Sequence, residues 1–446
     1  MNRNENSTAQ IRFRPKEAQE NWASPSVTEA ALWVENGVAK HGDLQGKIDA
    51  SGAEGLVFHS EENELNAIVV RGESYKIKHA EIELSGYGCS DFTSRGAAVL
   101  ADEKSSVIVE DSRILTKGST RSATIATRGS TLKVYNSVLD TRGGPLPPDY
   151  KPVIGPGMME PPSPLGLGGN CRTHLSMDNS ETFFYHCKVI AAGWAGLSTD
   201  ASGGYVYVEA NDTEIDITGN GYCVYADNGC HVQLNDCSFT TGNMAVIQDG
   251  NSSVVMERTS GHCEKVGFML HGGMPEWKDT GLIRLNGGKI TSKQEMFQCK
   301  STNADIYIIA AELESEQGVL LRTMVTDDPF YHKHRTRGDA CYGVQLTLEQ
   351  TAINGDILRE DTERKLRVSL EDAALTGAIT GGADLYLYGS AKWTANKNSY
   401  VVLHSDDISG IDAMEGVIIT AVAGDGCSLR DVAALPSGGV LTFAER

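Results

Sequence analysis

The sequence lacks several features that define common protein classes. No stretch approaches eighteen uninterrupted apolar residues, so no membrane span is expected. Basic residues are outnumbered, at 39 Lys and Arg against 59 Asp and Glu. The resulting net charge of −20 disfavours binding to nucleic acid or to an anionic membrane. No glycine-rich phosphate loop, GxSxG elbow or HExxH motif occurs, and long amphipathic helices are hard to find.

The chain also lacks a secretory signal and paired cysteines. Its start, MNRNENSTAQIRFRPKEAQENW, has no apolar core, which predicts a cytoplasmic protein, or a secreted one if the amino terminus was trimmed. None of the ten cysteines forms a Cys-x-x-Cys pair. We therefore expect buried, reduced thiols that act as small hydrophobic residues.

What the sequence does contain is a repeat. Val232 and Leu234, followed by Phe239, form an apolar template that recurs along the chain, for example as Val107, Val109 and Ile114. Copies start at 75, 107, 132, 232, 283, 306, 346, 368 and 386, with weaker copies at 182, 206 and 254. Several successive starts lie 22 to 26 residues apart, a period that is typical of stacked repeats.

A second column supports the repeat. Five residues after each start stands a residue that is small in every copy but one, as expected at a tight bend between two apolar positions. These residues are Ala80, Ser112, Ser137, Cys187, Asn211, Cys237, Thr259, Gly288, Ala311, Thr351, Ala373 and Ala391.

With these two columns, residues 46 to 400 resemble the right-handed parallel β-helix proteins of the pectate-lyase-like superfamily. The resemblance implies an all-β solenoid of about 12 or more coils, with long loop insertions on its side and capped ends. That superfamily includes polysaccharide lyases, glycoside hydrolases, uronate epimerases and non-enzymatic adhesins. The polygalacturonase motifs are not found in order, and a pectate-lyase calcium cluster is not evident. No family catalytic residue is therefore carried over.

Departures from the repeat define the predicted organisation. Residues 1–45 are expected to cap one end, as a short helix or a first strand, and residues 401–446 to form final coils and a second cap. Insertions are predicted at about 142–181, 271–281 and 324–343. The first contains PLPPDYKPVIGPGMMEPPSP, with eight of the 13 prolines, which cannot form a central strand. Tyr150 and Lys151 in this loop could contact a ligand or simply pack against the coils.

The strands that precede the template carry the most informative chemistry. The residue six positions before each template start is mostly small in the early coils, although one of these coils has Asp200 at this position. Four later coils have Gln248, His271, Lys300 and Arg322 there, once the insertions are allowed for. With strands about 4.8 Å apart, these four side chains would form a polar row. The alternative is an exposed polar ladder that keeps the sheet soluble.

The later insertions add titratable and aromatic groups. One contains Trp277, and the other contains Tyr331, His332, His334 and Arg335. His332 and His334 lie on one side of an extended segment and could bind a divalent metal, but no third ligand is identified. No cofactor is therefore predicted.

Two functions from different classes follow. The first is an enzyme that uses acid/base chemistry, namely elimination, isomerisation or epimerisation, or hydrolysis, on a sugar acid, oligosaccharide or small oxygenated ligand. The second is a non-catalytic adhesin-like or carbohydrate-binding β-helix, as the Thr/Gly/Asn-rich coils after residue 366 suggest. The apolar carboxy-terminal strands could also support a homo-oligomer. The candidate catalytic residues are His271, Lys300, Arg322, His332 and His334, and the candidate binding residues are Gln248, Tyr150, Lys151, Asp200, Trp277, Tyr331 and Arg335.

Overall fold

The computed structural model describes residues 28–90, 92–154, 157–162, 165–200, 204–272, 280–326 and 343–444. The chain divides into two compact units, residues 1–243 (unit 1) and 244–446 (unit 2). Across the described ranges the fold is all-β, built from long parallel sheets and without an α-helix. Accordingly, none of these ranges contains a helix long and apolar enough to cross a membrane.

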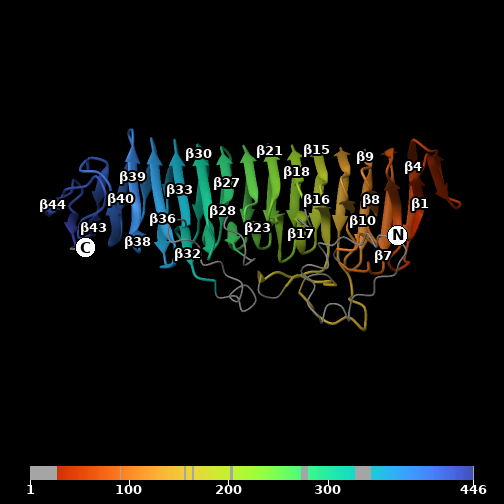
Figure 1. The fold of residues 1–446 in the computed structure, drawn as a ribbon, viewed down its shortest axis with the longest axis horizontal. Coiled ribbons are helices and arrows are strands. Elements are labelled where there is room, and N and C mark those ends of the chain that lie inside the picture. Colours follow the sequence, from red (N-terminus) through yellow and green to blue (C-terminus); the bar gives the residue numbers. More distant parts are fainter. Residues whose placement is uncertain are drawn as a thin grey trace, which may run out of the picture. The chain divides into compact units, whose positions relative to one another are not determined.

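Each coil of unit 1 contributes three strands, and each strand pairs in parallel with its equivalent in the next coil (Figure 1). The first strands form sheet A, whose far edge is an antiparallel hairpin of β1 and β2. Sheet A of this unit comprises β1 (Ala30–Glu35), β2 (Val38–His41), β5 (Asn66–Arg71), β8 (Val99–Asp102), β11 (Thr124–Ala126), β14 (Arg172–Met177), β17 (Trp194–Asp200) and β20 (Gly221–Ala226).

The second and third strands of each coil are separated by a sharp corner and form rows B and C. β3 (Gln45–Ile48) pairs antiparallel with β4, which contacts both rows. Row B of unit 1 comprises β4 (Gly52–Ser60), β6 (Ser74–Lys78), β9 (Ser106–Glu110), β12 (Thr131–Tyr135), β15 (Glu181–Tyr185), β18 (Val206–Asn211) and β21 (Cys230–Asn235). Row C comprises β7 (Glu81–Ser85), β10 (Arg113–Lys117), β13 (Val138–Thr141), β16 (Lys188–Ala191), β19 (Glu214–Ile217) and β22 (Ser238–Thr241).

Unit 2 has the same three kinds of strand. Its sheet A comprises β23 (Met244–Asp249), β26 (Phe268–His271), β29 (Phe297–Lys300), β32 (Val319–Met324), β35 (Asp356–Arg359) and β38 (Ile379–Thr380). Its row B comprises β24 (Ser253–Glu257), β27 (Gly281–Asn286), β30 (Ala304–Ile309), β33 (Gly343–Glu349), β36 (Lys365–Glu371), β39 (Ala383–Tyr388), β41 (Ser399–Leu403), β43 (Ile418–Ala423) and β45 (Val440–Phe443). Its row C comprises β25 (Ser260–Cys263), β28 (Lys289–Ser292), β31 (Glu312–Ser315), β34 (Ala352–Asn354), β37 (Ala374–Thr376), β40 (Lys392–Ala395) and β42 (Ile411–Ala413). A short β44 (Ala433–Ala434) pairs antiparallel with β45.

The corner between rows B and C explains the small-residue column. One residue at each corner adopts a left-handed conformation, such as Asp111 with φ 49°. The next residue is small, and in several coils its side chain donates to the carbonyl two residues back, as Ser112 does to Glu110 at 2.7 Å. Asn211 is not in this column: the corner residue is Asp212, and Thr213 takes the small position.

The apolar template faces the interior in nearly all coils. Val107, Val109 and Ile114 are 0 to 1% exposed. The copy that starts at 386 is wrong by one residue, because its corner is one residue longer. Leu385 pairs with the buried Val368 and is itself buried, whereas Tyr388 is 45% exposed.

The predicted insertions lie between consecutive strands, but the first is shorter than predicted, because residues 172–177 form β14. Residues 142–171 separate β13 from β14, residues 272–280 separate β26 from β27, and residues 325–342 separate β32 from β33. The described part of the proline-rich loop contains no strand. A further loop, residues 86–98, separates β7 from β8 and was not predicted. The capping role of residues 1–45 stays a prediction, although its described part forms strands and no helix.

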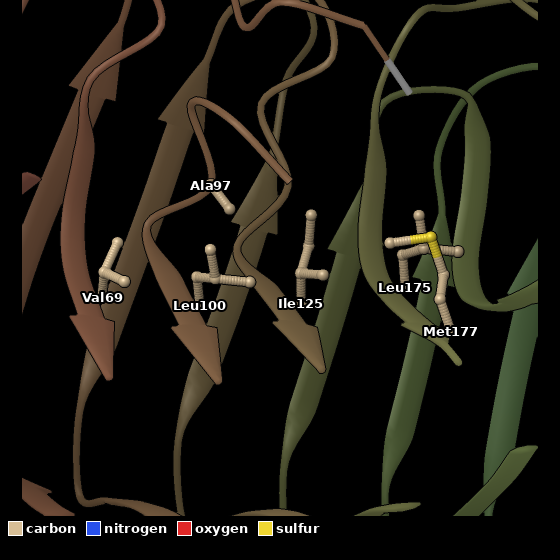
Figure 2. Packing of buried hydrophobic residues seen from close by; sticks show 6 residues of the cluster. All are labelled: Val69, Ala97, Leu100, Ile125, Leu175 and Met177. Atoms are coloured by element: carbon tan, nitrogen blue, oxygen red, sulfur yellow. The ribbon is translucent and has the colours of Figure 1, made fainter. Parts of the chain in front are cut away.

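The outer face of sheet A in unit 1 carries an apolar cluster (Figure 2). Val69, Leu100, Ile125 and Leu175 lie in register on successive strands and are 0 to 3% exposed. Trp33 and Phe92 pack against this cluster, together with Ala30. β5, β8, β11 and β14 are therefore buried on both faces, as their nearly continuous burial indicates.

The interior of unit 1 also contains a polar network around His174. The ring contacts Phe184 of row B edge-on, so His174 faces the interior. Its Nδ1 lies 2.9 Å from the hydroxyl of Thr124, and its Nε2 lies 2.8 Å from the hydroxyl of Ser176. The Ser176 hydroxyl in turn lies 2.8 Å from that of Thr182. Burial lowers the pKa of His174 from 6.5 to about 3, so the ring is neutral in the folded protein.

Two further buried groups stabilise the loop between β7 and β8. Arg121 is fully buried, and its guanidinium donates to the backbone carbonyls of Glu62, Leu65 and Gly96. Gly118 lies so close to Gly86 that a Cβ atom at Gly118 would be 1.5 Å from the Gly86 carbonyl oxygen. The nine described cysteines are free thiols, and eight of them are buried, as predicted; Cys341 lies outside the described residues.

Candidate functional site

The outer face of sheet A in unit 2 carries a row of titratable side chains at the ends of three neighbouring strands. Asp249 of β23 pairs in register with His271 of β26, and His271 pairs with Lys300 of β29. Met324 of β32 continues the row. Because register partners on adjacent parallel strands lie about 4.8 Å apart, the three charged or titratable groups are direct neighbours.

The predicted four-residue row is wrong at two positions. Gln248 pairs with Leu270 and not with His271, and Arg322 pairs with Gln298 and not with Lys300. Gln248 is one residue away from the row, and a shift of one residue turns a side chain to the opposite face of a strand. Arg322 is two residues away, so it lies on the same face as Lys300 but one pleat before the position that Met324 occupies. Asp249, the last residue of β23, takes the place predicted for Gln248.

Gln248 has a structural role instead. Its side chain is 1% exposed and donates through Nε2 to the carbonyls of Ser252 at 2.9 Å and Gly250 at 3.3 Å. Gln248 is in register with the buried Leu270 and Cys299, so it faces the interior. Its two hydrogen bonds stabilise the turn that leads from β23 to β24. This position is unsuited to contact with a ligand on the outer face.

Asp249 and His271 form the closest contact in the row. Nδ1 of His271 lies 3.5 Å from Oδ1 of Asp249, and the side chains are 4% and 5% exposed, respectively. A carboxylate at this distance stabilises the positive charge that the imidazole ring carries when it accepts a proton. The pair can therefore accept and return a proton in surroundings that contain little water.

Lys300 supplies a positive charge on the next strand. It is partly exposed, and it is the register partner of the nearly buried His271. An ammonium group in this position can attract a carboxylate or stabilise negative charge that develops on an oxygen atom. Asp249, His271 and Lys300 together are called the acid/base cluster below.

Arg322 lies beside the acid/base cluster but is held by two carboxylates. Its Nε lies 2.9 Å from Oε1 of Glu295, and its Nη1 lies 2.5 Å from Oε1 of Glu360. The Arg322 side chain is 28% exposed. Since both ion pairs join neighbouring coils, we interpret Arg322 as a clamp between strands and not as a charge reserved for a ligand.

The remaining predicted residues are distributed over other parts of the chain. In unit 1, the hydroxyl of Tyr150 accepts a hydrogen bond from the backbone N–H of Met159 at 3.1 Å, and Lys151 is exposed. Met158 and Met159 are 6% and 3% exposed, which supports packing as their role. Asp200 ends β17 and pairs with Met177. Trp277, Tyr331, His332, His334 and Arg335 lie outside the described residues.

The metal prediction at His332 and His334 likewise falls outside the described residues. Within the ranges that are described, no three His, Cys, Asp or Glu residues lie close enough together to hold a metal ion. Searches against protein-family models and against curated protein sequences found no match.

Proposed function

We propose that this chain is a right-handed parallel β-helix of the pectate-lyase-like kind, with about 12 or more coils. We further propose that it is an enzyme whose acid/base cluster moves a proton on a sugar acid or an oligosaccharide that contains one. The observation that carries the proposal is the nearly solvent-excluded contact between Asp249 and His271, with Lys300 in register on the next strand.

Each residue of the cluster has a distinct role in this proposal. Lys300, the most accessible of the three, binds the carboxylate of the substrate and brings the adjacent C–H bond toward His271. His271 accepts the proton from that carbon, and Asp249 holds the ring and balances its positive charge. The electron pair left on carbon is delocalised into the carboxylate, where Lys300 stabilises the added charge.

Two outcomes of this step are chemically complete. If the glycosidic oxygen at the neighbouring carbon leaves with the electron pair of its own C–O bond and takes the proton that His271 holds, the electron pair left on carbon forms a carbon–carbon double bond. The chain is then cleaved by elimination. If water instead delivers a proton to the opposite face of the same carbon and His271 releases its own proton to solvent, the product is the epimer. Glycoside hydrolysis usually requires two carboxyl groups that flank the bond. The acid/base cluster, as defined by described residues, pairs one carboxylate, Asp249, with the histidine. The cluster therefore favours elimination or epimerisation.

The test is turnover of a panel of polyuronates and oligouronates by the full chain. Elimination is followed by the ultraviolet absorbance of the new double bond. Because general acid/base groups contribute roughly 10²- to 10⁴-fold to rates, His271→Ala should lower kcat by at least about 100-fold. Asp249→Asn should lower kcat with little change in KM. Lys300→Met should raise KM, because the substrate carboxylate loses its partner, and should also lower kcat, because the added charge is no longer stabilised. His262→Ala is the matched control, because His262 lies on β25 of the same unit, where its Nδ1 lies 2.7 Å from the Thr291 hydroxyl.

The outcomes separate the two predicted functions. A folded His271→Ala variant with unchanged turnover would contradict the proposal. Saturable binding of the oligouronates without turnover by the unaltered protein would contradict it as well, and would support the non-catalytic carbohydrate-binding alternative.

A further inference from the structure

The outer face of row B in unit 1 carries a cluster of rings, which we call the aromatic strip. Its members come from β12, β15, β18 and β21 and from the residue just before β18. They are Tyr135, Phe183, Tyr185, Tyr205, Tyr207 and His231.

The strip faces away from the core. Residues that alternate with it along the same strands, such as Val134, Phe184 and Val208, are fully buried. Tyr205, by contrast, is 51% exposed. Since successive side chains of a strand point to opposite faces, the rings lie on the solvent side of row B. The other five rings are partly buried, so the strip is a contiguous and partly exposed apolar surface. Contiguous apolar surface that stays accessible to solvent often marks a binding site.

The rings follow one another from coil to coil. Tyr135 and Tyr185 are stacked, with ring centroids 4.9 Å apart and planes 10° apart. Tyr207 lies 5.8 Å from Phe183, and Tyr205 lies 5.2 Å from His231. The spacing of strands, about 4.8 Å, sets these separations. Each of the four coils therefore has at least one ring, and the coils of β15 and β18 have two each. The spacing of the coils is close to the length of one pyranose residue.

A polar network borders the rings on the same face. The Tyr207 hydroxyl donates to Oε2 of Glu209 at 2.7 Å, and Nδ2 of Asn211 donates to Oε1 of Glu209 at 2.9 Å. Nδ2 of Asn235 donates to Asn211, and Nε2 of Gln233 donates to Asn235, both at 2.9 Å. These side chains are only partly buried, so the surface offers fixed hydrogen-bond donors and acceptors beside flat apolar rings.

We propose that the aromatic strip binds an uncharged polysaccharide chain that runs across the strands of row B. A pyranose ring has an apolar C–H face that can stack on an aromatic ring and a rim of hydroxyls that both donate and accept hydrogen bonds. The strip and its polar border supply both kinds of partner. This site lies in unit 1, goes beyond the acid/base chemistry proposed for unit 2 and does not depend on it.

Charge determines the choice of occupant. Glu181 and Glu209 lie on the strip's face with a single cation, Lys133, whose Nζ is 5.7 Å from the Phe183 ring. A polyuronate would therefore be repelled, whereas an uncharged chain would not. A second copy of this chain would bring its own net charge of −20 to the surface, which disfavours self-association there.

The experiment is native affinity electrophoresis of the full chain in gels that contain a soluble glucan, xylan or mannan, with polygalacturonate as the charged comparison. We expect at least one uncharged polysaccharide to retard the protein, and polygalacturonate not to. Tyr205→Ala combined with Tyr207→Ala should weaken the interaction at least about tenfold. Tyr307→Ala, which removes a 36% exposed tyrosine from β30 in unit 2, is the matched control and should leave retardation unchanged.

Three results would overturn the proposal. The first is that no uncharged polysaccharide retards the protein. The second is that the folded double variant and the unaltered protein are retarded equally. The third is that no polysaccharide retards the protein, while the unaltered protein self-associates and the double variant does not. Tyr207→Phe guards against a folding defect, because it keeps the ring and should retain most of the binding. His271→Ala should be retarded like the unaltered protein, which separates failure of this proposal from failure of the proposed enzyme.

Discussion

Acidification should destabilise unit 1 through the buried ring of His174. This histidine has a pKa of about 3 in the folded protein because it is buried, against 6.5 for a solvated ring. Between these two values the unfolded chain binds one proton more than the folded chain does. The free energy of unfolding therefore falls as the pH falls, and this contribution is fully present only above about pH 6.5.

The magnitude follows from the two pKa values. Each pH unit in this window changes the free energy of unfolding by about 1.4 kcal/mol. Lowering the pH from 6.5 to 4.5 should thus remove roughly 2 to 3 kcal/mol that is due to His174 alone. That is a substantial part of the roughly 5 to 15 kcal/mol by which a typical domain is stabilised.

The assay compares urea unfolding of the unaltered protein and of His174→Gln at several pH values, followed by circular dichroism. Glutamine keeps hydrogen-bonding groups near Thr124 and Ser176 but does not titrate. The carboxylates of the chain titrate in both proteins alike, so the difference between the two proteins reports on His174. The stability difference between the two proteins should shrink steadily below about pH 6.5. His41→Gln, which removes an exposed histidine, should not reproduce that change. Parallel stability curves for the unaltered protein and His174→Gln would refute the reasoning.

Two further predictions concern the loop between β7 and β8. Arg121→Met leaves three backbone carbonyls without their donor, so it should lower the free energy of unfolding by about 3 kcal/mol or more. Its control is Arg113→Met, which removes an exposed arginine and should change the free energy of unfolding by less than about 0.5 kcal/mol. Gly118→Ala should cost about 1 to 3 kcal/mol because its Cβ would overlap the Gly86 carbonyl, and Gly42→Ala, with nothing within 4 Å, should be close to neutral. Urea unfolding measures the free energy of unfolding of all four variants. If a variant at a buried site and its control were equally stable, the contact assigned to that site would be contradicted.

The repeat was predictable because it depends on residues that are close in the sequence. A row B strand, its corner and the following row C strand span about ten residues, so Val107, Val109 and Ile114 indicate the same face without knowledge of the fold. The prediction was wrong where a corner changes length or is misplaced, as for Tyr386 and Asn211. A hydrophobic pattern alone does not reveal one extra residue at a bend.

The site was harder to predict because it depends on register between coils separated by insertions. His271 and Lys300 were correctly aligned, since β26 and β29 pair residue by residue over their whole length. The prediction was wrong by one residue for Gln248 and by two residues for Arg322. Because of its one-residue offset, Gln248 faces the interior and not the row. Asp249 was overlooked as a partner because an Asp before Gly, as in Asp249-Gly250, is also typical of a simple turn.

The most direct test of the acid/base cluster is deuterium exchange into a bound uronate. Oligouronates are incubated with the full chain in deuterated water, and the proton on the carbon beside the carboxylate is followed by nuclear magnetic resonance. The account predicts that this proton is lost or exchanged in the presence of the unaltered protein and of His262→Ala. It predicts no exchange with His271→Ala. Exchange at the same rate in folded His271→Ala would contradict the assignment of the cluster.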